Sequence, residues 1–136
     1  MKIIFEPIGY VHSEFKNVKD IPTQSVLASE KIGEIELLDK FKDGLLGLKK
    51  GMHIVVLFNF HESKDYKLIQ SPCYTNEEKG VFSIRSPFRP NGIGMSIVKI
   101  ESIRDNILEF KGLDMLDKTP ILDIKPYVVS LNPKID

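Results

Sequence analysis

The fold is decided by Ile93-Gly94-Met95-Ser96-Ile97-Val98-Lys99-Ile100-Glu101-Ser102-Ile103-Arg104-Asp105-Asn106-Ile107-Leu108-Glu109-Phe110-Lys111. Apolar and polar residues alternate over Ile97–Glu101 and again over Ile107–Lys111, which is the pattern of half-buried strands. Between the two runs, Arg104-Asp105-Asn106 predicts a tight hairpin, because Asp and Asn tolerate turn conformations. The stretch therefore predicts two neighbouring antiparallel strands.

Further strand-like runs occur on both sides of this hairpin, and they are rich in Ile, Val and Phe. Many short strands without alternating long helices indicate a mainly β fold. We expect residues 1–136 to form one domain, a small closed or nearly closed β-barrel. The complete set of predicted strands is Ile3–Phe5, Ile8–His12, Ile32–Leu38, His53–Phe60, Val81–Arg85, Ile93–Ile103, Ile107–Gly112 and Ile121–Lys125.

One short helix is predicted over Leu37–Leu48, where leucines and a phenylalanine recur at spacings of three and four residues. Lys49-Lys50-Gly51 supplies a cationic stop. We interpret the leucine stripe as core packing. Tyr10–Glu30 and Ser63–Lys79 are predicted to be long irregular loops, a class of segment that often carries function in small domains.

Composition limits the possible classes of protein. With 42% hydrophobic and 28% charged residues, the chain can bury a core. Its 19 basic and 19 acidic residues give no net charge, so binding of nucleic acid phosphates would need a local basic patch. The single Cys73 excludes an internal disulfide, suggests no metal site and fits a reducing cytoplasm. No run is long enough to span a membrane, and Met1–Glu6 does not read as a signal peptide.

A rigid cationic turn, Arg85-Ser86-Pro87-Phe88-Arg89-Pro90-Asn91, lies before the Ile93 strand. Each proline fixes its own φ and favours an extended residue before it, so the two arginines project from a backbone with little freedom. Guanidinium groups match carboxylate and phosphate edges and stack on flat rings. The turn therefore predicts a binding site for an anionic or aromatic ligand. The alternative is a solvated turn with a local salt bridge.

The segment Leu113–Tyr127 interrupts apolar residues with Asp114, Asp117 and Asp123. Three carboxylates at this density need cations, hydroxyls or backbone N–H groups as partners. A glycine-rich dinucleotide motif of the GxGxxG type is absent, so any nucleotide-like cofactor would bind in a site of another architecture.

Several segments together resemble the TrmO family, formerly the TsaA-like family, and the resemblance runs from about residue 6 to about residue 128. The matching segments, in chain order, are Ile8-Gly9-Tyr10-Val11-His12-Ser13, Leu57-Phe58-Asn59-Phe60-His61-Glu62, Gly80-Val81-Phe82, Arg85-Ser86-Pro87-Phe88-Arg89-Pro90-Asn91, Ile93-Gly94-Met95-Ser96, Leu113-Asp114 and Thr119-Pro120-Ile121-Leu122-Asp123-Ile124-Lys125-Pro126-Tyr127.

The chain departs from the family pattern at four positions. Gly92 stands where a second proline is usual, and Lys118 replaces a usual glycine, which disfavours a left-handed backbone there. His12 replaces a usual arginine, and Glu62 stands where glutamine is common. Larger members also carry a C-terminal extension beyond the point where this chain stops.

The resemblance implies an S-adenosylmethionine-dependent methyltransferase that acts on N6 of threonylcarbamoyladenosine next to the anticodon in tRNA. It implies a β-barrel and a homodimer with the cofactor site near the interface. The cofactor-binding residues that it implies are Pro22, Thr23, Gln24, His61, Glu62, Arg85, Met95, Leu113, Asp114 and Met115.

The chemistry of the side chains assigns a ligand contact or a proton-accepting role to several of these positions. Arg85 suits the cofactor carboxylate, and Asp114 suits its ammonium group or a ribose hydroxyl. We expect Arg89 and Asn91 to bind the modified nucleoside or neighbouring phosphates. Proton removal from the nitrogen needs a base, for which Asp117, Asp123 and His61 are the candidates.

Two other functions remain open at this stage. One is a methyltransferase of the same architecture acting on a small metabolite, which zero net charge favours. The other is a non-catalytic module that binds an adenine nucleotide or RNA through the two arginines.

Overall fold

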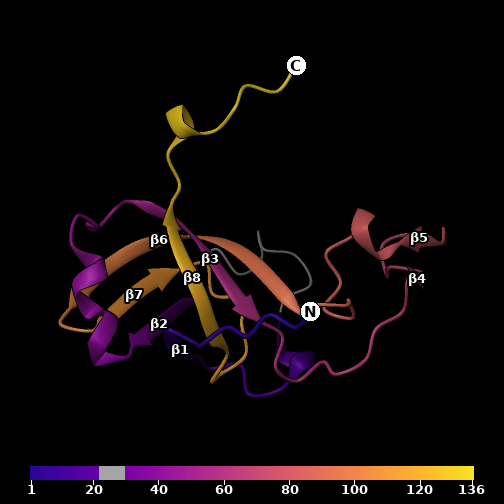
Figure 1. Cartoon of the computed structure of the whole chain (residues 1–136), viewed down its shortest axis with the longest axis horizontal. Coiled ribbons are helices and arrows are strands. Elements are labelled where there is room, and N and C mark those ends of the chain that lie inside the picture. The colour runs from indigo at the N-terminus through magenta and orange to yellow at the C-terminus, as the bar shows by residue number, and fades with distance from the viewer. Residues whose placement is uncertain (22–29) are drawn as a thin grey trace.

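Six antiparallel strands form a closed barrel in the order β1-β2-β7-β6-β3-β8 in the computed structural model, which describes residues 1–21 and 30–136 (Figure 1). The predicted mainly β barrel is therefore confirmed. A separate pair of two-residue strands, β4 and β5, lies outside it. The strands are β1 (Gly9–His12), β2 (Ile32–Leu37), β3 (His53–Asn59), β4 (Ile69–Gln70), β5 (Lys79–Gly80), β6 (Ile93–Arg104), β7 (Ile107–Lys111) and β8 (Pro120–Pro126).

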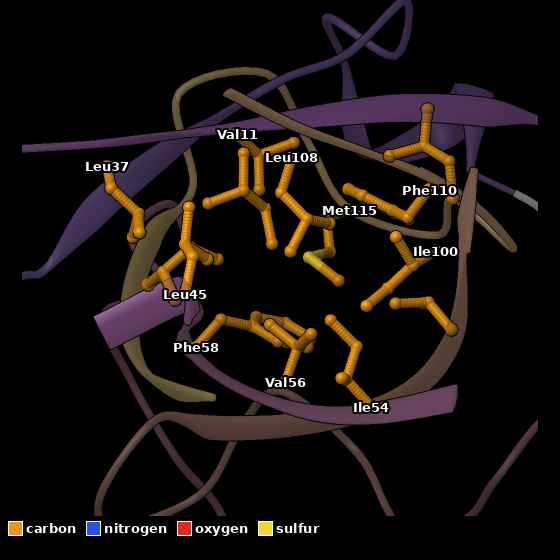
Figure 2. Close-up of a cluster of buried hydrophobic side chains, with 14 of the residues drawn as sticks. Val11, Leu37, Leu45, Ile54, Val56, Phe58, Ile100, Leu108, Phe110 and Met115 are labelled. Atoms are coloured by element: carbon orange, nitrogen blue, oxygen red, sulfur yellow. The ribbon is translucent and has the colours of Figure 1, made fainter. Parts of the chain in front are cut away.

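Alternating residues of each strand fill the barrel with apolar side chains, as Figure 2 shows. Ile54, Ile100 and Phe110 are fully buried, and they come from three strands that are consecutive in the ring. Met115, from the segment between β7 and β8, also points into this core. The period-two alternation in the sequence thus corresponds to an inner and an outer face of the barrel wall.

The predicted short helix lies within Leu37–Leu48, but it is shorter than expected and of the 3-10 type. The structure has a 3-10 helix, η3 (Asp39–Leu45), and Leu37 is the last residue of β2. The Leu37 carbonyl, which would accept the first helical bond, instead accepts from the Asn106 side-chain amide at 2.8 Å. Gly47 then adopts a φ of 99°, which ends the helical geometry. Other 3-10 turns are η1 (Val18–Asp20), η4 (Val81–Ser83) and η5 (Val129–Leu131).

Two predicted strands are also wrong. Ile3–Phe5 has no strand partner, and its side chains are 63 to 92% exposed. Val81–Arg85 begins with the 3-10 turn η4, in which Val81 is buried, and the buried Ile84 follows directly after it. Their spacing of three residues matches the 3-10 repeat rather than the strand repeat. The other six predicted strands are confirmed with bounds that differ by at most one residue.

Two residues with positive φ matter for the connections. The predicted hairpin between β6 and β7 is confirmed, and Asp105 in its turn has a φ of 55°. Lys118 has a φ of 67°, so it adopts the left-handed backbone that its side chain is expected to disfavour. Its N–H donates to the Val11 carbonyl at 2.7 Å, and this bond holds the conformation. Within the described ranges, no helix is long and apolar enough to cross a membrane.

Candidate functional site

Strand β6 changes partners along its length, and this leaves an unpaired edge. Residues Ile93–Lys99 pair with β3, whereas β7 pairs only with Lys99–Arg104. The edge of β6 from Ile93 to Val98 that faces away from β3 therefore has no strand partner among the described residues. Unpaired strand edges present backbone donors and acceptors, so this edge is available to a ligand.

The alternation of an antiparallel pair identifies the backbone groups that point to this edge. Ile100 exchanges bonds with the β3 side, since its N–H donates to the Met52 carbonyl at 2.9 Å and its carbonyl accepts from Gly51 at 2.8 Å. Successive residues turn these groups to opposite sides. Met95 and Ile97 therefore direct their N–H and carbonyl groups away from β3.

A half-buried acid, Asp114, lies beside this edge. Ser96 is 6% exposed and donates its hydroxyl to the Asp114 carboxylate at 2.7 Å. Burial raises the pKa of Asp114, and the hydrogen bond from Ser96 opposes this effect. The bond joins β6 to the segment after β7 and fixes the carboxylate at the site. A half-buried carboxylate that accepts bonds only from the Ser96 hydroxyl and its own backbone retains capacity to accept bonds from a ligand.

His61 follows β3 and borders the same groove. Its Nδ1 is buried and has no hydrogen-bond partner among the described residues. Its Nε2 lies 3.7 Å from a carboxylate oxygen of Glu62, whose side chain is 62% exposed. Since buried polar atoms are nearly always paired, the unpaired nitrogen points to a missing ligand contact.

The arginine turn forms another wall of the groove. Arg85 is exposed and makes no hydrogen bond or ion pair within the described part of the chain. Arg89 is half-buried, and its Nη1 donates to the carbonyls of Ile84 at 3.0 Å and Ser86 at 3.2 Å. Asn91 is exposed at the groove, and its carbonyl accepts from Ile93. The two arginines thus occupy different environments.

These features line one open groove of about 1470 Å³. Exposed Ile93, Met95 and Ile97 supply its apolar part from the outer face of β6. Of the predicted site residues, the groove brings together His61, Glu62, Arg85, Arg89, Asn91, Met95, Asp114 and Met115.

Two predicted carboxylates do not line this groove. Asp117 accepts from Lys16 at 2.8 Å and from the Ser13 N–H at 2.9 Å. Both bonds lower the pKa of Asp117, and the bond from Lys16 has the larger effect. Asp123 pairs with Lys125 at 2.8 Å. Both carboxylates are therefore already satisfied.

Leu113 and Met115 have buried side chains, so only their backbone is available to a ligand. The Leu113 N–H already donates to the Lys31 carbonyl, and the Met115 carbonyl accepts from the Ser13 hydroxyl at 2.8 Å. Pro22, Thr23 and Gln24 lie outside the described residues.

Sequence reasoning missed two residues of the groove. Ser96 is a buried serine at an inward position of β6, and the next inward residues are Val98 and Ile100. A polar residue in this apolar series indicates a functional position, and it could have been found from the sequence. Phe82 is 81% exposed at the groove, but it was assigned to a strand. Such exposure of a phenylalanine was not evident from the sequence.

Comparison with known proteins adds a family to this geometry. The family model described as the tRNA-methyltransferase O N-terminal domain, TrmO_N, matches residues 10–132. The chain belongs to this family. The resemblance noted from the sequence motifs is thus confirmed.

Individual relatives extend over most of the chain. An S-adenosyl-L-methionine-binding protein of Archaeoglobus fulgidus is 40% identical over 134 residues, which cover 98% of this chain and 93% of that protein. A mouse tRNA (adenine(37)-N6)-methyltransferase is 36% identical over 133 residues, which cover 93% of this chain and 31% of that protein. The crystal structure of TrmO from Pseudomonas aeruginosa superposes with a TM-score of 0.82 at 39% identity. The match covers all of this chain and 60% of the crystallised one.

Proposed function

We propose that this TrmO_N chain is an S-adenosylmethionine-dependent methyltransferase that methylates N6 of threonylcarbamoyladenosine next to the anticodon of tRNA. The observation that carries the proposal is the combination, in one groove, of an unpaired β6 edge, the half-buried Asp114 carboxylate and the free Arg85 guanidinium. Relatives named as S-adenosyl-L-methionine-binding proteins and as a tRNA methyltransferase support the cofactor and the reaction class.

The residues of the groove fit the polar groups of this cofactor. The backbone N–H and carbonyl groups of Met95 and Ile97 suit the hydrogen-bonding edge of an adenine ring. The Arg85 fork suits a carboxylate, and the half-buried Asp114 suits an ammonium group or a ribose hydroxyl. When bound, the cofactor supplies a methyl group made electrophilic by a sulfonium, so the protein gains most by alignment.

His61 is the proton acceptor that we assign to the reaction. The substrate N6 bears a proton that must leave when the nitrogen gains a methyl group. Among Asp117, Asp123 and His61, only His61 borders the groove. Its unpaired Nδ1 is free to accept a proton, whereas the carboxylates of Asp117 and Asp123 are held by lysines. Asn91, exposed at the groove, suits the carbamoyl group of the substrate.

We also propose a homodimer with the cofactor groove near its interface. The outer face of β6 carries Ile93, Met95 and Ile97, which are 41 to 47% exposed. Adjacent exposed apolar residues of this kind commonly mark an interface. Sedimentation should give a dimer, and a monomer that binds the cofactor at full affinity would contradict this part of the proposal.

The decisive experiment measures methyl transfer to tRNA with and without the threonylcarbamoyl group. We expect methylation only of the modified tRNA and its loss in His61→Ala. Methylation of unmodified tRNA would overturn the substrate assignment. Cofactor binding without transfer to either tRNA would favour the small-metabolite alternative. Absence of S-adenosylmethionine binding in isothermal titration would refute the cofactor assignment itself.

A further inference from the structure

The Arg89 side chain donates hydrogen bonds to the backbone on both sides of Arg85. One nitrogen of its guanidinium, Nη1, donates to the carbonyl of Ile84 and to the carbonyl of Ser86, at 3.0 and 3.2 Å. These two carbonyls belong to the residues immediately before and after Arg85. The peptide group before Arg85 and the peptide group after Ser86 are therefore tied to a single side chain.

The other contacts of the turn hold the same segment from outside. The Phe88 N–H donates to the Ser86 hydroxyl at 3.1 Å, and the Gln70 side-chain amide donates to the Phe88 carbonyl at 2.6 Å. Ile84 is 8% exposed and anchors the start of the turn. These contacts fix the ends of the turn, and the bonds from Arg89 fix its middle. Arg85 is left with an ordered backbone and a free guanidinium.

We propose that Arg89 is a positioning residue that orders Arg85 for cofactor binding. The proposal rests on the function proposed above, in which Arg85 binds the carboxylate of the cofactor. It changes the role that the sequence suggested for Arg89, which was contact with the nucleoside or its phosphates. A half-buried guanidinium that already donates twice to the backbone is poorly placed to serve as the main contact for RNA.

The expected effect follows from pre-organisation. Without Arg89, the carbonyls of Ile84 and Ser86 bond to water, and the turn samples several conformations before a ligand binds. Ordering it again upon binding reduces affinity by roughly tenfold, the usual scale for restoring order to one or two residues. Because Arg89 acts through Arg85, its removal should have no further effect once Arg85 is absent.

A double-mutant cycle on the full chain tests this, with S-adenosylmethionine affinity measured by isothermal titration. The variants are Arg85→Ala, Arg89→Ala, the double mutant and Arg89→Lys. Arg104→Ala is the matched control, because Arg104 pairs with Glu34 on the surface and does not line the groove. We expect Arg89→Ala to weaken binding roughly tenfold and Arg89→Lys to recover part of the loss. The double mutant should bind like Arg85→Ala, and the control like the parent.

Two outcomes would overturn the proposal. Unchanged cofactor affinity in Arg89→Ala, with a raised KM for tRNA, would show that Arg89 contacts the tRNA substrate and does not position Arg85. Additive losses in the double mutant would show that Arg89 acts on the fold rather than through Arg85.

A second measurement separates failure of this proposal from failure of the proposed function. The NMR order parameter of the Arg85 amide, measured without ligand, should fall from about 0.85 in the parent to below about 0.6 in Arg89→Ala. An unchanged order parameter refutes positioning whether or not the chain binds S-adenosylmethionine. A lowered order parameter in a chain that binds no cofactor would refute only the proposed function.

Discussion

Replacing Lys118 with glycine should stabilise the protein. Lys118 has a φ of 67°, a region in which an L-residue with a side chain loses about 1–2 kcal/mol through contact of its Cβ with the backbone. Glycine removes that cost, but it gains about 0.5–1 kcal/mol of freedom in the unfolded chain. The backbone bond to Val11 is kept. The net gain should be about 0.5–1 kcal/mol, which corresponds to a rise in Tm of about 2–5 °C for a domain of this size.

Urea denaturation of both proteins, followed by circular dichroism, measures this gain. The matched control is Lys64→Gly, because Lys64 is also exposed but does not have a positive φ. The control should lose about 0.4–1 kcal/mol, because only the unfolded chain benefits from the new glycine. If Lys118→Gly lost stability as the control does, the left-handed conformation would not be strained and the reasoning would fail.

Three further changes probe the groove and its support. Asp114→Asn should raise the free energy of unfolding at pH 7 and weaken cofactor binding. Because burial raises the pKa of Asp114, the gain in stability measured by denaturation should appear as pH rises through that pKa and vanish in acid. Gly94→Ala places a Cβ 2.4 Å from the ring of Phe58 and should cost about 1–3 kcal/mol in urea denaturation, whereas Gly44→Ala, with open space around it, should cost nothing. Phe82→Ala should reduce tRNA affinity about tenfold in filter binding at fixed salt, through loss of base stacking, and leave cofactor affinity unchanged.

The sequence was sufficient for the barrel because the barrel is encoded locally. The β6–β7 hairpin combines two alternating runs with a two-residue turn, so each strand and its partner can be read from neighbouring positions. The failures have an equally local cause. The composition of Val81–Arg85 is typical of a strand, and only the burial of Val81 together with Ile84, three residues apart, identifies the 3-10 turn. Ile3–Phe5 has strand composition, but a strand also needs an edge to pair with.

The groove was predicted less completely because it depends on contacts between distant segments. The arginine turn was evident, since prolines and arginines act through their own backbone and charge. The surroundings of Asp117 were not, because they are formed by Ser13 and Lys16, about a hundred residues earlier in the chain. The Ser96–Asp114 bond likewise depends on where β7 ends. No local pattern specifies such pairings.

The mismatch between β6 and its neighbours leads to a last prediction. β6 has 12 residues and β7 has 5, so part of β6 must face something other than β7. Proteins usually protect such edges with charges or prolines, but the outward residues here are Ile93, Met95 and Ile97. If a cofactor covers the edge and a second copy covers the outer face, the two binding events share one strand.

Thermodynamic linkage then requires that each event change the affinity of the other by the same factor. Sedimentation at a series of protein concentrations, with and without S-adenosylmethionine, measures that factor as the change in the dimer dissociation constant. Titration of the cofactor at protein concentrations above and below the dimer dissociation constant measures the same factor as the difference in cofactor affinity between dimer and monomer. We expect the cofactor to tighten the dimer about fivefold or more, the lower end of typical coupling between sites. A dimer whose dissociation constant does not change with the cofactor would show that the interface and the groove lie on separate parts of the molecule.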